Sequence, residues 1–149
     1  MKSAAAYMSS KEWIFHPDSI TTVGVGLATE PFIKIKLPFT ANDILEAIKQ
    51  ALAAVRTGIP HPTDWKAQTE SYERNMGYSS KKLHRNFMYC LIEVDETFFY
   101  FTPTKNLGSS KGYTYLPANK IKIEISSPAE DIYDALLKSM KISKESVED

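Results

Sequence analysis

Two stretches of the chain follow the same pattern of residues. Residues 33–52 read IKIKLPFTANDILEAIKQAL and residues 121–140 read IKIEISSPAEDIYDALLKSM, so they share Ile-Lys-Ile, two alanines and an Asp-Ile pair. In each stretch, apolar and charged side chains first alternate, as in a strand with one solvated face, and apolar residues then recur at helical spacing. The match has two explanations: an internal duplication, or convergence of two segments on a common strand–cap–helix unit. Either explanation predicts two strands that each carry a helix.

Helix start signals follow both of these strands. Thr40 and Asp43 have the spacing of a capping box, and the segment Ser127-Pro128-Ala129-Glu130 combines a cap, a proline at the first position and a reciprocal glutamate. We therefore predict helices over residues 41–56 and 128–141. Their apolar stripes predict that these helices cover the sheet and that the following side chains face it: Ile44, Ile48, Leu52, Val55, Ile132, Leu136 and Met140.

Other patterns predict the remaining elements. Two apolar, aromatic-rich runs separated by Asp95-Glu96 favour a hairpin of central strands. Further strands are predicted at 13–16 and 20–25, on either side of a Pro17-Asp18-Ser19 turn, and at 32–37. Further helices are predicted at 64–76, ending at Gly77, and at 80–85, and a loop at 104–112.

The length and the order of these elements predict one domain. A chain of 149 residues is of ordinary single-domain size. We expect an α+β fold over residues 1–149, with a mainly antiparallel sheet of five to seven strands and helices packed chiefly on one side. The ends, residues 1–10 and 143–149, are expected to fray.

Composition argues against several classes of function. Lys plus Arg equals Asp plus Glu at 18 each, and no basic stripe is visible, so we do not expect direct binding of nucleic acid. The single cysteine cannot form an intramolecular disulfide. Because the chain shows no apolar run of signal-peptide or membrane-helix length, we expect a cytoplasmic protein without a membrane partner.

A scan for catalytic motifs is negative. The chain has no phosphate-binding loop, no nucleophile elbow and no paired-cysteine zinc motif. His16, His61 and His84 are far apart and lack a nearby second ligand, and Cys90 lies in an apolar run typical of an inert, buried thiol. The aromatic run 98–101 is better explained by core packing than by base stacking, because alternation sends only half of its rings to one face. We expect no enzyme activity, no metal and no cofactor.

One segment, residues 63–78, mixes carboxylates with large aromatic side chains. Such a surface suits a basic protein partner, since aromatic anchors supply buried area and carboxylates supply steering and specificity. The alternative is an ordinary solvated helix whose aromatic residues point at the sheet. Within this segment the candidate contact residues are Asp64, Trp65, Glu70, Tyr72, Glu73 and Tyr78.

The second half of the chain resembles the immunity proteins of bacterial contact-dependent growth inhibition systems. The resemblance spans about residues 60–143. It rests on Trp65, on residues 76–83 (MGYSSKKL), on 101–104 (FTPT), on Gly112-Tyr113, and on 121–143 with Ala135-Leu136 and Ile142-Ser143.

That resemblance implies a non-enzymatic, cytoplasmic protein that binds and occludes the C-terminal toxin domain of a cognate exoprotein. Many such toxins are nucleases, some of them tRNases, and an inhibitor of a basic nuclease is often more acidic than this chain. Asp95, Glu96 and Tyr113 join the candidate toxin-binding residues, because the hairpin tip and the following loop are as accessible in principle as 63–78. A small enzyme or a nucleic-acid-binding module with an unrecognised site remains the alternative.

Overall fold

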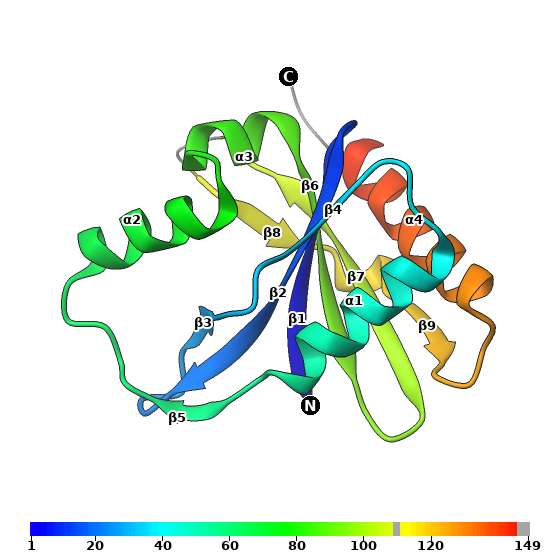
Figure 1. Ribbon diagram of the computed structural model, residues 1–149, viewed down its shortest axis with the longest axis horizontal. Coiled ribbons are helices and arrows are strands. Elements are labelled where there is room, and N and C mark those ends of the chain that lie inside the picture. Colours follow the sequence, from blue (N-terminus) through cyan, green and yellow to red (C-terminus); the bar gives the residue numbers. More distant parts are fainter. Residues whose placement is uncertain (109–110, 146–149) are drawn as a thin grey trace.

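The computed structural model describes residues 1–108 and 111–145 and shows one α+β domain (Figure 1). Its helices are α1 (Ala41–Ala53), α2 (Trp65–Met76), α3 (Ser80–Asn86), the 3-10 turn η1 (Pro117–Asn119) and α4 (Ala129–Glu145). Its strands are β1 (Lys2–Met8), β2 (Glu12–Thr21), β3 (Gly26–Ala28), β4 (Ile33–Lys36), β5 (Thr57–Ile59), β6 (Met88–Val94), β7 (Phe98–Asn106), β8 (Tyr113–Tyr115) and β9 (Ile121–Glu124). The domain is thus built from strands and helices that are mixed along the chain.

The nine strands of the described residues form one curled sheet, which is larger than the five to seven strands predicted. Its main path runs β3-β2-β1-β6-β7-β8, while β4 and β5 pair with β2, and β9 pairs with β7. All pairs are antiparallel except β2 with β5. The additional strands are mostly three-residue edge strands, which are too short to leave an alternating pattern in the sequence.

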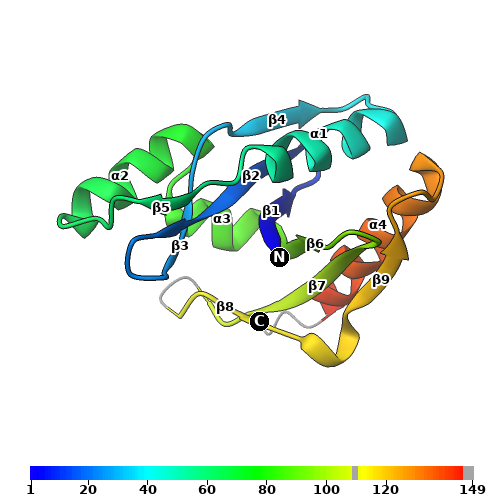
Figure 2. The same ribbon diagram turned by 90° about the horizontal axis from the view of Figure 1, so that it is seen from below.

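The sheet consists of two equivalent halves that meet where β1 pairs with β6. In the first half β2 pairs with β1, β4 and β3, and in the second half β7 pairs in the same way with β6, β9 and β8. In Figure 2, β4 and α1 lie on one side of β1, and β9 and α4 lie on the other. The structural repeat therefore covers five elements in each half. They are β1, β2, β3, β4 and α1 in the first half and β6, β7, β8, β9 and α4 in the second.

Residue pairs in the two halves match in register. Trp13 lies opposite Ile35 as Phe99 lies opposite Ile123. The Trp13 ring stacks on Phe15 at 5.8 Å between centroids, and the Phe99 ring stacks on Phe101 at 6.2 Å. A match this extensive goes beyond what a common strand–cap–helix unit requires, so the structure favours duplication over convergence.

The two long helices share one face of the sheet, as predicted. The capping box at Thr40 and Asp43 begins α1, and α1 contacts α4 above the strands (Figure 1). The core between helices and sheet includes the completely buried side chains of Ile44, Ile48, Ile132, Leu136 and Met140, together with the nearly buried Leu52. Burial of these apolar stripes fixes both helices to the sheet.

The shorter helices α2 and α3 pack against the other face. A second apolar cluster there joins Met76 and Leu83 to sheet residues on β1, β2 and β6: Ala5, Tyr7, Ile14 and Tyr89. The segment that carries β5, α2 and α3 lies between the two halves and has no counterpart in the described part of the second half. It is therefore the part of the fold that the repeat does not explain.

The prediction that residues 1–10 fray is wrong. Residues 2–8 form β1, which lies in the middle of the sheet between β2 and β6. Ala4, Ala5 and Ala6 are buried, because their small side chains allow helices to approach both faces of the central strand. At the other end, Ser143 is buried within α4, and residues 146–149 lie outside the described residues.

Two further local predictions are also wrong. Residues 17–19 do not form a turn, since β2 continues through Pro17. Pro17 lies on the edge of β2 between the end of the pairing with β4 and the start of the pairing with β3. Its carbonyl accepts the Thr29 N–H at 3.1 Å. Because neither pairing needs an N–H at this position, the proline breaks no hydrogen-bond ladder. The predicted loop 104–112 is shorter, because Thr104 to Asn106 continue β7 and pair with β8; residues 109–110 lie outside the described residues.

Candidate functional site

The unrepeated helices α2 and α3 form the candidate site. The Asp64 carboxylate accepts the Ala67 N–H at 3.0 Å and so caps α2, and the helix ends at Gly77, whose φ of 83° lies in the left-handed region that favours glycine. Ser79 then caps α3 by accepting the Lys82 N–H. Because only Tyr78 lies between these two caps, the chain turns sharply and leaves a hollow between the helices.

This hollow has a volume of about 600 Å³ and brings together three of the predicted residues, Glu70, Glu73 and Tyr78. Arg74 and Lys82 also line it, so its walls carry both signs of charge. Glu73 has a structural role as well, since its carboxylate accepts the Ser80 N–H at 2.7 Å at the start of α3. Glu70, by contrast, is exposed and has no such contact with α3 among the described residues.

Tyr78 connects this surface to the sheet. Its hydroxyl donates a hydrogen bond to the carboxylate of Glu12 at the start of β2, and this bond raises the pKa of Tyr78 above its usual value. Glu12 is 4% exposed, and its second oxygen has no hydrogen-bond partner among the described residues. The phenol is therefore anchored and presents only part of its ring to the surface.

The side chains of two other predicted aromatic residues pack into the fold. Tyr72 packs edge-on against His16 and Phe32, and burial raises its pKa to about 12. Tyr113 stacks on His84 at 4.6 Å between ring centroids, and burial raises its pKa. For Tyr72 the structure matches the alternative interpretation, in which the aromatic side chain points at the sheet. Tyr113, which we predicted on an accessible loop, also packs against the second apolar cluster.

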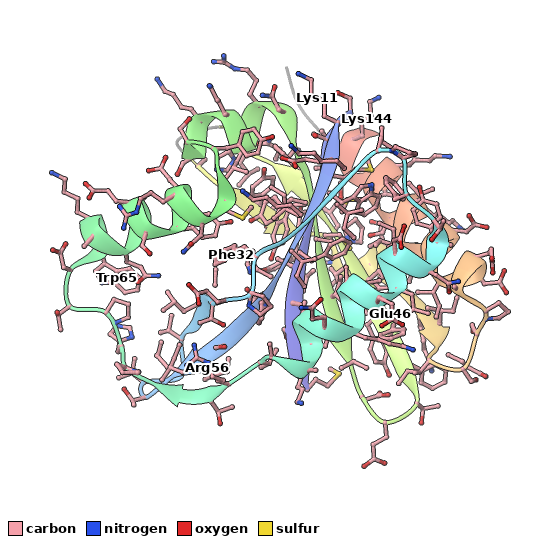
Figure 3. The ribbon with its side chains drawn as sticks, in the orientation of Figure 1. Lys11, Phe32, Glu46, Arg56, Trp65 and Lys144 are labelled. Carbon is pink, nitrogen blue, oxygen red and sulfur yellow. The ribbon has the colours of Figure 1, made fainter. Side chains whose placement is uncertain are left out.

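Trp65 differs from these tyrosines. It lies at the N-terminal end of α2, is 50% exposed, and contacts His61 edge to face at 5.4 Å (Figure 3). The alternative in which its ring points at the sheet is therefore wrong. An exposed tryptophan on a solvated helix is a residue of the kind that anchors protein interfaces.

The structure does not bring Asp95 and Glu96 to this surface. Both lie at the tip of the β6–β7 hairpin, which is at the end of the sheet away from α3 (Figure 1). The Asp95 carboxylate accepts hydrogen bonds from the Tyr100 hydroxyl and from the Thr97 and Phe98 N–H groups, which lower its pKa. Asp95 thus closes the turn, and Glu96 is exposed beside it.

The side chains with chemical reactivity are dispersed. The Cys90 thiol is completely buried 3.2 Å from the Ser139 hydroxyl, and burial raises its pKa to about 12, which removes the thiolate needed for nucleophilic attack. His61 bonds Thr21, whereas His16 lies under α2 near Asp18. No group of three His, Cys, Asp or Glu side chains within the described residues could hold a metal ion. No helix in the described part of the chain is long and apolar enough to cross a membrane.

A second hollow, which we call the basic hollow, escaped the sequence analysis. Its volume is about 550 Å³, and Tyr78 borders it on the side of the first hollow. Its cations are Lys11 from the β1–β2 turn, Arg85 from α3 and Lys144 from the end of α4. Because these three residues come from distant parts of the chain, no local charge pattern could reveal them.

Comparisons with known proteins find the same fold elsewhere. The structure is similar to that of a protein of unknown function from Neisseria meningitidis, with a TM-score of 0.74 and 15% sequence identity over 95% of this chain and 94% of that one. It is also similar to a chain of a CdiA-CT/CdiI toxin and immunity complex from Yersinia pseudotuberculosis, with a TM-score of 0.68 and 12% identity over 99% of this chain and 97% of that one. No family model and no curated protein matches the sequence.

Proposed function

We propose that the protein is an immunity protein that binds and neutralises the C-terminal toxin domain of a contact-dependent growth inhibition exoprotein. The observation that carries this proposal is the full-length likeness to a chain of a toxin and immunity complex, at a TM-score of 0.68. The sequence resemblance between residues 60 and 143 supports the same function independently of that likeness. The toxin is a nuclease in this proposal, and the protein acts in the cytoplasm, where it occludes the toxin without modifying it.

The surface of α2 and α3 is the proposed interface. It belongs to the segment that the repeat does not account for, and it presents exposed Trp65 and Glu70 next to a hollow with charges of both signs. A mixed surface of this kind explains how a chain without net charge can complement a charged partner. The exposed aromatic ring supplies apolar contact, and the carboxylate supplies steering.

The test is a titration of the purified toxin domain, encoded immediately upstream, with this protein. Immunity by occlusion predicts a one-to-one complex, loss of toxin activity at equivalence, and recovery of that activity when the complex is separated. Inactivation at substoichiometric amounts would point to an enzyme instead. Absence of a complex would overturn the proposed function.

Two substitutions test the interface. Trp65→Ala should weaken binding at least about tenfold if the ring is an anchor, and Glu70→Lys should mainly slow association. Asp64 and Glu73 are less suitable, since each also accepts a hydrogen bond that begins a helix. Glu46→Lys is the matched control, because Glu46 is exposed on α1, on the other face of the sheet (Figure 3). Wild-type affinity in both Trp65→Ala and Glu70→Lys would exclude this face of α2 from the interface.

A further inference from the structure

The basic hollow combines three unpaired cations with an apolar floor. Lys11, Arg85 and Lys144 are exposed, and no ion pair joins any of them to a carboxylate within the described residues. Among the described residues, the other walls carry no acidic side chain. Three like charges with no counter-ion among the described residues repel one another, and an anionic ligand would relieve this repulsion.

The elements around the hollow bring these three residues to its walls. The Ser9 hydroxyl accepts hydrogen bonds from the N–H groups of Lys11 and Glu12, each at 3.2 Å, which fixes the β1–β2 turn that carries Lys11. Arg85 lies in the last turn of α3, and Lys144 lies in the last turn of α4. Figure 3 shows Lys11 and Lys144 close to each other at the same end of the molecule. The cations therefore converge from three ordered elements.

The floor determines which anion fits best. Met8 and Met88 are partly buried and lie opposite each other on β1 and β6, and the buried Phe87 lies beside them. Apolar contact of this kind adds nothing to the binding of a small inorganic anion, which remains hydrated. It does add binding energy for a peptide in which a carboxylate side chain neighbours an apolar one, because methionine side chains adapt to different apolar groups.

We propose that the basic hollow binds an acidic segment of the partner protein, with Asp or Glu carboxylates paired to Lys11, Arg85 and Lys144 and an adjacent apolar side chain on Met8 and Met88. This inference rests on the proposed function, in which the partner is the toxin domain. It extends the interface from α2 across Tyr78, which borders both hollows, to the end of α4. It also assigns the toxin a local acidic patch, whatever the net charge of its domain.

Zero-length carbodiimide cross-linking of the complex tests the pairing directly, because this reagent joins a lysine amine only to a carboxylate in contact with it. Mass spectrometry should find Lys11 and Lys144 linked to Asp or Glu of the toxin domain, and the exposed Lys49 on α1 should remain unlinked. Links to the toxin that involve only lysines outside the basic hollow would overturn the inference.

Affinity measurements provide the second test. The combined variant Lys11→Gln, Arg85→Gln and Lys144→Gln should bind the toxin domain at least about tenfold more weakly and with a smaller dependence on salt. A control variant with Lys2→Gln, Lys49→Gln and Lys138→Gln removes the same charge from other exposed positions and should bind like wild type. Thermal unfolding of both variants verifies that they fold.

These experiments separate the inference from the function on which it rests. Wild-type affinity of the combined variant, in a protein that still forms the toxin complex, would overturn only the inference. Failure of the unaltered protein to form any complex would overturn both. Binding of a labelled single-stranded RNA 20-mer to the unaltered protein, lost in the combined variant, would replace the acidic peptide with a nucleic acid.

Discussion

Tyr78, in the link between α2 and α3, donates its phenolic hydrogen bond to Glu12 at the start of β2. The two residues are 66 positions apart, and this bond is a polar contact between the candidate interface and the start of β2. Glu12 is nearly inaccessible to water, so its carboxylate depends on this donor. The position of the α2–α3 link is therefore coupled to a buried carboxyl group.

Replacing Tyr78 with phenylalanine should destabilise the protein. The substitution keeps the ring but leaves the buried Glu12 carboxylate without its donor, and the free energy of unfolding should fall by about 1 to 3 kcal/mol. Urea unfolding followed by circular dichroism measures this change. Tyr100→Phe is the control, because it removes a phenol–carboxylate bond to Asp95 at an exposed turn and should change stability far less. Equal effects of the two variants would contradict the role assigned to Glu12.

The helix-facing core should respond strongly to truncation. Leu136 is completely buried and Leu52 is 5% exposed, and each packs between a helix and the sheet. Leu136→Ala and Leu52→Ala should each lower the free energy of unfolding by about 2 to 5 kcal/mol. Leu37→Ala, at a side chain that is 59% exposed, should stay within about 0.5 kcal/mol of wild type. Urea titrations distinguish these outcomes, and small losses at both core positions would argue against the packing described.

Cys90 should be unreactive in the folded protein. Its thiol is inaccessible, and burial raises its pKa to about 12, so almost no thiolate exists near neutral pH. A chromogenic disulfide reagent should therefore release no signal from the native protein and one equivalent after denaturation. Cys90→Ser should abolish the signal in denaturant, since the chain has one cysteine. Rapid labelling of the native protein would show that the strand opens.

His16 should make the protein less stable in mild acid. It is surrounded by Tyr7, Phe32 and Tyr72, and burial lowers its pKa below 6.5, an effect that Asp18 only partly offsets. As the pH falls below about 6.5, the unfolded chain binds a proton that the folded protein does not, so the free energy of unfolding falls. Burial raises the pKa of Asp18 above 3.8, which acts in the opposite direction at lower pH.

Urea unfolding at about pH 7.5 and about pH 5.5 measures this dependence. His16→Gln should lose most of the decline in stability between these two pH values, because the variant has no titrating group at this position. His61→Gln, at a half-buried position on the surface, should keep it. A decline in His16→Gln as large as that of wild type would assign the effect to another group.

Elements with local sequence signals could be predicted before the fold was known. The capping box at Thr40 and Asp43 and the apolar stripes at Ile44, Ile48, Ile132 and Leu136 specified α1 and α4, and Gly77 specified the end of α2. These features depend on neighbours three or four positions away, so they can be read without knowledge of the rest of the fold. The likeness between residues 33–52 and 121–140 was equally visible, and it predicted that both halves would place a helix on a strand.

The choice of the central strand and the grouping of the three cations depend on contacts between distant segments of the chain. Ala4 to Ala6 have weak strand propensity on their own, yet their small side chains fit the crowded centre between two layers of helices. Pro17 interrupts no hydrogen-bond ladder only because β4 and β3 meet β2 on either side of it. Lys11, Arg85 and Lys144 form one surface because β1–β2, α3 and α4 end at the same place, and contacts between such distant segments leave no periodic trace in a sequence.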